Sequence, residues 1–280
     1  MHIPPQMLTG PICPVTAAVT AITLTACGAW VYKRSVDSIL ETAKEAAGKE
    51  LRKKVYGSII QGALKFIGIT AIVYVLQALN FPILKDINNP TSFITGHFIG
   101  GVLAAAILGI PGGILSMATV LAIQAWHSDG GVDALGANII NMGIVGAGIG
   151  GLIRLGLNKL GSNNLVSTGI AAFCGLVLAV LTLDAELAIC GKGTVEVFKA
   201  LMFAHLPLAV IEAFIAAGLY AILTGSLRQP SLRFSVAAAA VVLIIAVALL
   251  YFPGASSLPD GLEWTIEQCN LMPEETIQQL

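Results

Sequence analysis

The sequence has four histidines, and one of them is the second residue of the chain. A free α-amine on Met1, the backbone nitrogen of residue 2 and the imidazole of His2 can close fused five- and six-membered chelate rings around a metal ion. Ni(II) and Cu(II) displace the amide proton readily because they favour planar nitrogen coordination. We expect Met1 to be retained, since a bulky second residue blocks removal of the initiator methionine. The mature chain would then have a free amine directly before His2. The alternative is that His2 is an ordinary residue at a frayed terminus.

Such a planar site needs a fourth donor, and His97 is the candidate for it. His97 is expected at the outer start of an apolar helix, on the same side as His2. The small residues around it, Thr95-Gly96 and Gly100-Gly101, leave room for another segment of the chain. The alternative is a histidine at a helix start that faces lipid headgroups.

Other polar residues lie in or beside apolar runs. His127 in the polar loop after Trp126 is a ligand, a residue on the access path or an interfacial residue, and the last reading is favoured. Asp129 in the same loop can accept a hydrogen bond from a ligating imidazole. Asn138 and Asn141 share one face of a helix, where they hydrogen-bond between helices or support a site from outside.

His205 and Glu212 are two helical turns apart on one face of a long apolar helix. Ionisable groups inside a membrane are functional candidates by default, because they are expensive to bury. A buried structural pair explains them equally well.

The elements that position these residues are expected to cross a membrane. The chain has 280 residues, of which 56% are hydrophobic and 11% charged, about half the charged share of a soluble domain. Its five cysteines form no CxxC pair, and its net charge of −1 gives no reason to expect a nucleic-acid partner. The composition predicts an all-α, polytopic integral membrane bundle.

Apolar runs long enough to cross a bilayer predict about seven transmembrane helices and one more at the C-terminus. The predicted spans are Cys13–Tyr32, Tyr56–Leu79, two within Gly96–Trp126 separated by a break at Gly109–Gly113, then Gly136–Leu157, Leu165–Ala188, Val195–Leu223 and Phe234–Phe252. The charged stretch Ser35–Val55 predicts an amphipathic helix on the membrane surface. The stretch Ile83–Thr95 predicts a polar loop.

The basic residues predict the orientation of the chain in the cytoplasmic membrane. With the N-terminus outside, 11 of the 15 basic residues fall on the cytoplasmic side, seven of them between Lys33 and Lys54. Both termini are then extracytoplasmic. The tail after Phe252 is acidic and too poor in apolar residues to build a core of its own. It attracts cations, helps to seat the terminal loop, or is simply solvated.

Several motifs together resemble the CbiM/NikM family, the substrate-capture components of energy-coupling-factor transporters for cobalt and nickel. The motifs are Met1-His2-Ile3-Pro4, Leu79-Asn80-Phe81-Pro82, Thr95–Gly101, Asp129-Gly130-Gly131, Ala134–Met142, and His205-Leu206-Pro207 with Glu212. The resemblance covers residues 1–225, although Pro5 and Gln6 depart from the family pattern. Residues 226–280 resemble a PDGLE-type accessory module, which predicts a second domain with one transmembrane helix.

The resemblance implies that Ni²⁺ or Co²⁺ is bound outside by the Met1 amine, the His2 backbone and imidazole nitrogens, and His97. Separate ATP-binding cassette ATPases and a transmembrane coupling subunit would supply the energy, and no cofactor is expected. The chain lacks a GxxxxGK[ST] phosphate loop, as such a division of labour requires. The alternatives are a capture subunit for another small substrate, such as a vitamin, and an intramembrane enzyme. Neither HExxH nor paired catalytic carboxylates are present, so we expect no enzyme; nickel and cobalt are not distinguished.

Overall fold

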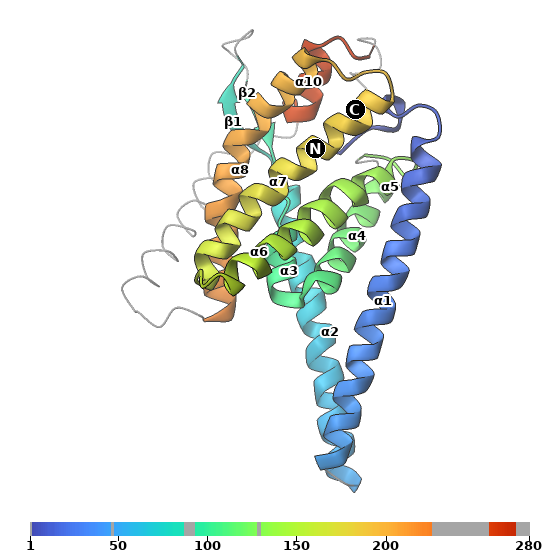
Figure 1. Ribbon diagram of the computed structural model, residues 1–280, viewed down its shortest axis with the longest axis vertical. Coiled ribbons are helices and arrows are strands. Elements are labelled where there is room, and N and C mark those ends of the chain that lie inside the picture. Colours follow the sequence, from blue (N-terminus) through green and yellow to red (C-terminus); the bar gives the residue numbers. More distant parts are fainter. Residues whose placement is uncertain (1, 46–47, 87–92, 128–129, 226–257, 273–280) are drawn as a thin grey trace.

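The protein is a helical bundle from which two long helices project (Figure 1). A computed structural model describes residues 2–45, 48–86, 93–127, 130–225 and 258–272. In chain order the elements are η1 (Pro5–Met7), α1 (Ile12–Glu45), α2 (Gly48–Ala78), β1 (Phe81–Lys85), β2 (Phe93–Gly96), α3 (Gly101–Leu108), α4 (Ile110–Trp126), α5 (Leu135–Asn138), the π-helical η2 (Ile139–Ile149), α6 (Gly150–Lys159), α7 (Asn164–Ile189), α8 (Val195–Thr224) and α10 (Gly261–Gln268).

Five helical stretches of the described chain are long and apolar enough to cross a membrane. They are α1, α2, the continuous stretch Leu135–Lys159 that joins α5, η2 and α6, then α7 and α8. This confirms the predicted all-α membrane bundle. The predicted C-terminal span Phe234–Phe252 lies outside the described residues, and so does most of the proposed second domain.

The third predicted span is shorter than expected. The eight residues of α3 rise only about 12 Å, against the ~30 Å of a hydrocarbon core. Gly109, at φ +80°, reverses the chain between α3 and α4, as the predicted break requires. Gly113 packs so closely that a Cβ there would lie 2.6 Å from the backbone of Ala105. The short α3 and its tight turn place the start of α3, whose first five residues are buried, inside the bundle.

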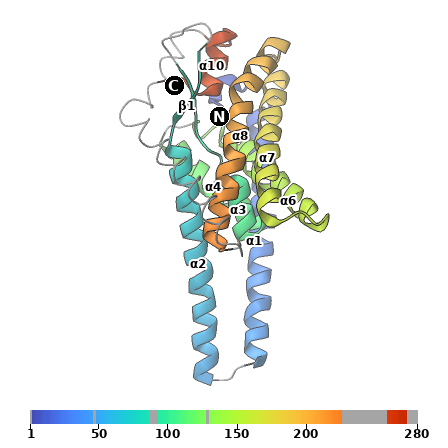
Figure 2. The same ribbon diagram turned by 90° about the vertical axis from the view of Figure 1, so that its left-hand side faces the viewer.

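The prediction of a separate surface helix at Ser35–Val55 was wrong. Here α1 continues to Glu45 and α2 begins at Gly48, so the charged stretch prolongs both helices. The two helices lie side by side and extend together beyond the bundle (Figure 2). We call residues 33–45 and 48–56 the α1–α2 projection. Its sequence has no proline, and no glycine before Gly48, so nothing in it breaks a helix. Extending an existing helix also costs less than nucleating a new one.

The predicted polar loop Ile83–Thr95 instead contains most of an antiparallel hairpin. β1 and β2 pair Phe81 with Gly96 and Lys85 with Phe93. The strands are rich in aromatic and branched residues, which suit a pleated surface, but they are only five and four residues long. Strands this short give little periodic signal in a sequence. β2 leads directly to His97.

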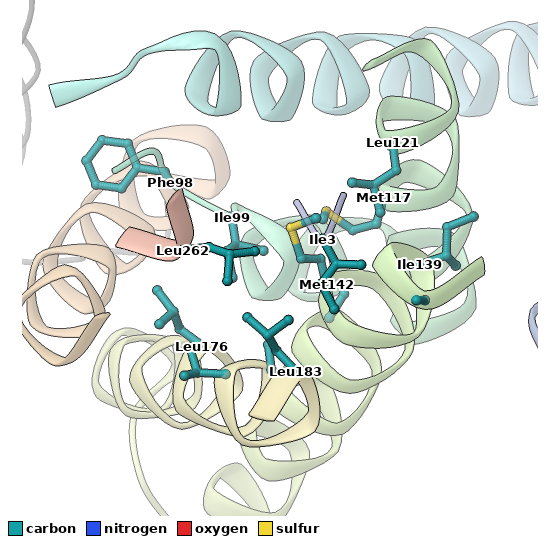
Figure 3. Close-up of a cluster of buried hydrophobic side chains, with 14 of the residues drawn as sticks. Ile3, Phe98, Ile99, Met117, Leu121, Ile139, Met142, Leu176, Leu183 and Leu262 are labelled. Atoms are coloured by element: carbon teal, nitrogen blue, oxygen red, sulfur yellow. The ribbon is translucent and has the colours of Figure 1, made fainter. Parts of the chain in front are cut away.

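Both ends of the described chain contribute to the buried core. Figure 3 shows Ile3, from the N-terminal loop, beside Met117 and Met142, and Leu262 of α10 beside Ile99. Ile3 and Leu262 have exposed fractions of 0% and 1%. The acidic tail is therefore not a solvated appendage over residues 258–272, because α10 packs on α8 and β2 and shares the core of the bundle.

Candidate metal site

The backbone that follows His2 is anchored by Asn138 at the end of α5. The backbone N–H of Ile3 donates to Asn138 Oδ1 over 2.8 Å, and Asn138 Nδ2 donates back to the Ile3 carbonyl over 3.4 Å. Asn138 is only 2% exposed. Its amide therefore bonds to the terminal loop, where it fixes the position of the residue after His2.

A pair of glycines lies against the same loop. Gly130 and Gly131 have φ of +82° and +69°, a region that side chains rarely adopt. A Cβ on Gly130 would lie 2.9 Å from His2 Cβ and 2.8 Å from Asn138 Nδ2, and one on Gly131 would lie 2.9 Å from Pro5 Cγ. Only glycine at positions 130 and 131 therefore lets this segment pack against the terminal loop. Asp129, the preceding candidate, lies outside the described residues.

The imidazoles of His2 and His97 are neighbours. Their rings are stacked, with centroids 5.2 Å apart and planes inclined by 22°. His97 is 6% exposed and His2 is partly buried. The structure thus brings together the two histidines on which the predicted site depends. Met1, the remaining predicted ligand, lies outside the described residues.

Gln124 of α4 sets the tautomer of His2. His2 Nε2 is 3.2 Å from Gln124 Oε1, and because a carbonyl oxygen only accepts, Nε2 carries the hydrogen. The other ring nitrogen, Nδ1, then has the lone pair, and Nδ1 is the atom that closes a six-membered chelate ring with the backbone nitrogen of His2. The sequence prediction did not include Gln124, although it is the one amide in the apolar sequence of α4.

Glu212 of α8 holds the chain just after His97. Its two carboxylate oxygens accept the backbone N–H groups of Ile99 over 3.0 Å and Gly100 over 2.8 Å. These amides precede α3, where a helix has unpaired donors and favours a negative charge. The carboxylate is 3% exposed. Glu212 therefore locks the loop that carries His97 to the centre of α8.

His205, two turns earlier on α8, has a different partner. Its Nδ1 donates to the Leu201 carbonyl over 2.8 Å, so it does not pair with Glu212 as one sequence reading suggested. The ring lies against Gly261 at the start of α10, where a Cβ would be 2.9 Å from His205 Cε1. Glu212 thus holds the chain after His97, whereas His205 contacts residues 258–272, which we call the C-terminal segment.

The C-terminal segment adds a short strand-like stretch beside β2. The Thr95 backbone N–H donates to the Pro259 carbonyl over 2.9 Å, and Thr95 pairs with Asp260 in a parallel bridge. The Thr95 hydroxyl also contacts the Leu258 and Pro259 carbonyls at 3.2 and 3.1 Å. The C-terminal segment therefore holds Thr95, before His97, and Glu212 of α8 holds Ile99 and Gly100, after it.

Two cavities adjoin the histidines. A cavity of about 480 Å³ lies between the terminal loop and α10, with His2, Gly130, Asp260 and Glu263 among its lining residues. A second one, of only about 10 Å³, lies between His97, His205 and Asp260, which is room for about one water-sized particle. The larger cavity therefore borders His2, and the smaller one borders His97.

Two other predicted residues lie elsewhere. His127 is exposed at the end of α4 and lines a separate apolar hollow with Leu24 and Phe66. Asn141 Nδ2 donates to Glu186 Oε2 over 2.8 Å, which joins η2 to α7. This is the interhelical role that the sequence favoured.

Within the residues that the structure describes, no group of three or more His, Cys, Asp or Glu residues is placed to hold a metal ion. Of the ligands predicted from the sequence, the described residues include His2 and His97, whose rings are stacked.

The chain is similar to known transport proteins. Two relatives are each 30% identical to it: a "putative fused nickel transport protein NikMN" of Archaeoglobus fulgidus, over 65% of this chain and 62% of the relative, and a putative metal transport protein of Haloquadratum walsbyi, over 60% and 73%. A crystal structure of a transition metal transporter matches with a TM-score of 0.61 at 25% identity, over 83% of this chain and 96% of the other. A truncated transition metal transporter gives 0.59 at 26%, over 80% and 99%.

All four proteins are described as transport proteins, which confirms the prediction of a transporter in preference to an enzyme. The chain spans less than two thirds of the Archaeoglobus relative. Residues 2–230 match the model of a family described as the cobalt uptake substrate-specific transmembrane region, CbiM. The resemblance seen in the short motifs thus extends over most of the chain, which belongs to the CbiM family.

Proposed function

We propose that this chain is the substrate-capture subunit of an energy-coupling-factor transporter that takes up Ni²⁺ or Co²⁺. The metal is bound by the Met1 amine, the backbone and imidazole nitrogens of His2, and the imidazole of His97. The observation that carries the proposal is the stacking of His2 on His97 at 5.2 Å, in a terminal loop anchored by Asn138.

The proposed donors are all nitrogen, which favours a transition metal over Mg²⁺ and Ca²⁺. Ni²⁺ accepts planar nitrogen coordination and Co²⁺ can use the same donors, whereas Mg²⁺ and Ca²⁺ prefer oxygen. The amine and the amide must lose a proton to bind the metal, and each ligating imidazole must be neutral. The hydrogen bond to Gln124 favours the neutral tautomer of His2 in which Nδ1 has the lone pair.

Energy for uptake comes, in this proposal, from other subunits. The chain has no phosphate loop, so ATP-binding cassette ATPases and a transmembrane coupling subunit drive the transport cycle. The metal site faces outward and the α1–α2 projection faces the cytoplasm. This orientation follows the basic residues, seven of which lie between Lys33 and Lys54, at and near the projection.

Metal uptake by cells tests this function. The chain is expressed together with coupling and ATPase subunits, and the accumulation of labelled Ni²⁺ and Co²⁺ is measured. Parallel cells lack only this chain or carry an ATPase inactivated at its phosphate loop. We expect saturable uptake of one or both metals that requires all subunits. Uptake of a vitamin and of neither metal would contradict the proposal.

A further inference from the structure

Asp260, from the C-terminal segment, lies between the two cavities of the candidate site. It lines the cavity of about 480 Å³ that also contacts His2, and the cavity of about 10 Å³ that also contacts His97 and His205. No other residue that the structure describes lines both of these cavities. A carboxylate from the far end of the chain is therefore part of the walls around both predicted imidazole ligands.

The position of Asp260 is fixed by its own helix and by β2. Asp260 Oδ1 accepts the backbone N–H groups of Leu262 over 2.8 Å and Glu263 over 2.9 Å, and Glu263 Oε2 accepts the Asp260 N–H over 2.9 Å. This capping box orders the start of α10. The bridge to Thr95 then ties the residue to the strand that leads to His97. The cap bonds use Oδ1, so capping does not depend on Oδ2.

A second feature brings the start of α10 close to His205. The next residue is Gly261, and a Cβ at this position would lie 2.9 Å from His205 Cε1 and 3.0 Å from Ala204 Cβ. Any larger residue would push the start of α10 away from α8. The close approach of the carboxylate to the site thus depends on a glycine.

We propose that Asp260 is a positioning residue of the metal site: its carboxylate orients the His97 imidazole and offsets part of the charge of the arriving cation. A carboxylate beside a ligating imidazole fixes the ring and raises its basicity. The C-terminal segment therefore completes the site with an element that follows the seven-helix bundle in the sequence. This inference rests on the proposed metal-binding function.

The competing explanation is that Asp260 only caps α10. Asparagine and serine cap helices about as well as aspartate, so Asp260→Asn and Asp260→Ser remove the charge and keep the cap. Glu267→Gln is the matched control, because it removes an exposed carboxylate of the same helix, α10, that lines neither of the two cavities.

The test measures Ni²⁺ binding to the purified full-length chain by isothermal titration calorimetry, with the thermal unfolding midpoint recorded for every variant. We expect Asp260→Asn and Asp260→Ser to weaken binding by about 10- to 100-fold, the range for lost support of a ligating histidine. Glu267→Gln should leave the Kd unchanged at a similar unfolding midpoint. Gly261→Ala, which keeps the charge but displaces it, should weaken binding as well.

Two outcomes would overturn the inference. One is an unchanged Kd in both Asp260 variants, and the other is an equal loss in Glu267→Gln, which would make the effect one of overall charge. His97→Ala, measured in the same series, separates this inference from the proposed function. If His97→Ala binds Ni²⁺ normally, the site itself is wrong. If only His97→Ala loses binding, the site stands and Asp260 plays no part in it.

Discussion

The metal-site end of the protein and the α1–α2 projection differ in how their residues are held. At the site, His2 bonds to Gln124, the residue after it bonds to Asn138, and Glu212 holds the chain behind His97. In the projection, large side chains such as Leu40 and Tyr56 are 55% and 60% exposed. The site is thus built by contacts between distant parts of the chain, whereas the projection depends on the continuity of two helices.

This difference has a functional meaning. The proposed metal site needs its donors held in place before the ion arrives, and α4, α5 and α8 hold His2 and the chain next to His2 and His97. The projection is rich in charged residues, and none of its described side chains lines the two cavities beside His2 and His97. Changes at the two ends should therefore separate metal binding from other properties.

The largest effect is expected from an extension of the N-terminus. One extra residue before Met1 would convert the chelating amine into an amide and move the new amine out of the ring. High-affinity Ni²⁺ binding should be lost, while the unfolding midpoint of the protein stays the same. Calorimetry on the purified chain measures this, with an extension at the C-terminus as the control. An intact affinity would remove the terminal amine from the site.

His97→Ala should have the next largest effect. It removes the fourth nitrogen donor, so the affinity for Ni²⁺ should fall by at least the ~10–100-fold seen when support of a ligand is lost. His127→Ala is the control, because His127 is exposed beside a separate hollow. Equal losses in the two variants would mean that the fourth donor is wrongly assigned.

Gly130→Ala should have an intermediate effect. Gly130 and Gly161 both have positive φ, so alanine costs about 1–2 kcal/mol of backbone strain at either position. Only at Gly130 would the new Cβ meet His2 and Asn138, because nothing lies within 4 Å of Gly161. Gly130→Ala should lower both stability and Ni²⁺ affinity, and Gly161→Ala stability alone. The Kd and the unfolding midpoint of both variants check this; two unchanged Kd values would show that the glycine pair does not shape the loop.

The smallest effect is expected in the projection. Leu40→Ser changes an exposed side chain on α1, so the free energy of unfolding should change by no more than about 0.5 kcal/mol. The Kd for Ni²⁺ should equal that of the unchanged protein. A weaker affinity would show that the projection is coupled to the site, contrary to the comparison drawn above.

The sequence predicted the features that have a local signal. Long apolar runs located the membrane helices, and Gly109 with Pro111 predicted the break between α3 and α4. The position and type of His2 and His97 predicted that they would meet. The sequence did not show that α3 is too short to cross a membrane or that the charged stretch prolongs α1. Hydropathy locates apolar runs, but it does not show where a helix begins or ends once it packs against other helices.

The supporting contacts could not be predicted for a different reason. Gln124 is 122 residues from His2, and Glu212 is 113 residues from the Ile99 amide that it accepts. No periodicity or spacing encodes such pairs, since they arise only when the bundle is packed. The alternative reading of His205 and Glu212 as a buried pair is wrong for the same reason, because a shared helix face does not determine which segments pack against it.

The most direct test of the metal site is to locate the ion itself. Crystals of the full-length chain grown with Ni²⁺ and measured at the nickel absorption edge give the position of the metal by anomalous scattering. The account predicts one strong peak next to the rings of His2 and His97, with nitrogen donors arranged in a plane that includes the amino terminus. A peak that lies away from both rings, or one coordinated by carboxylate oxygens alone, would contradict it.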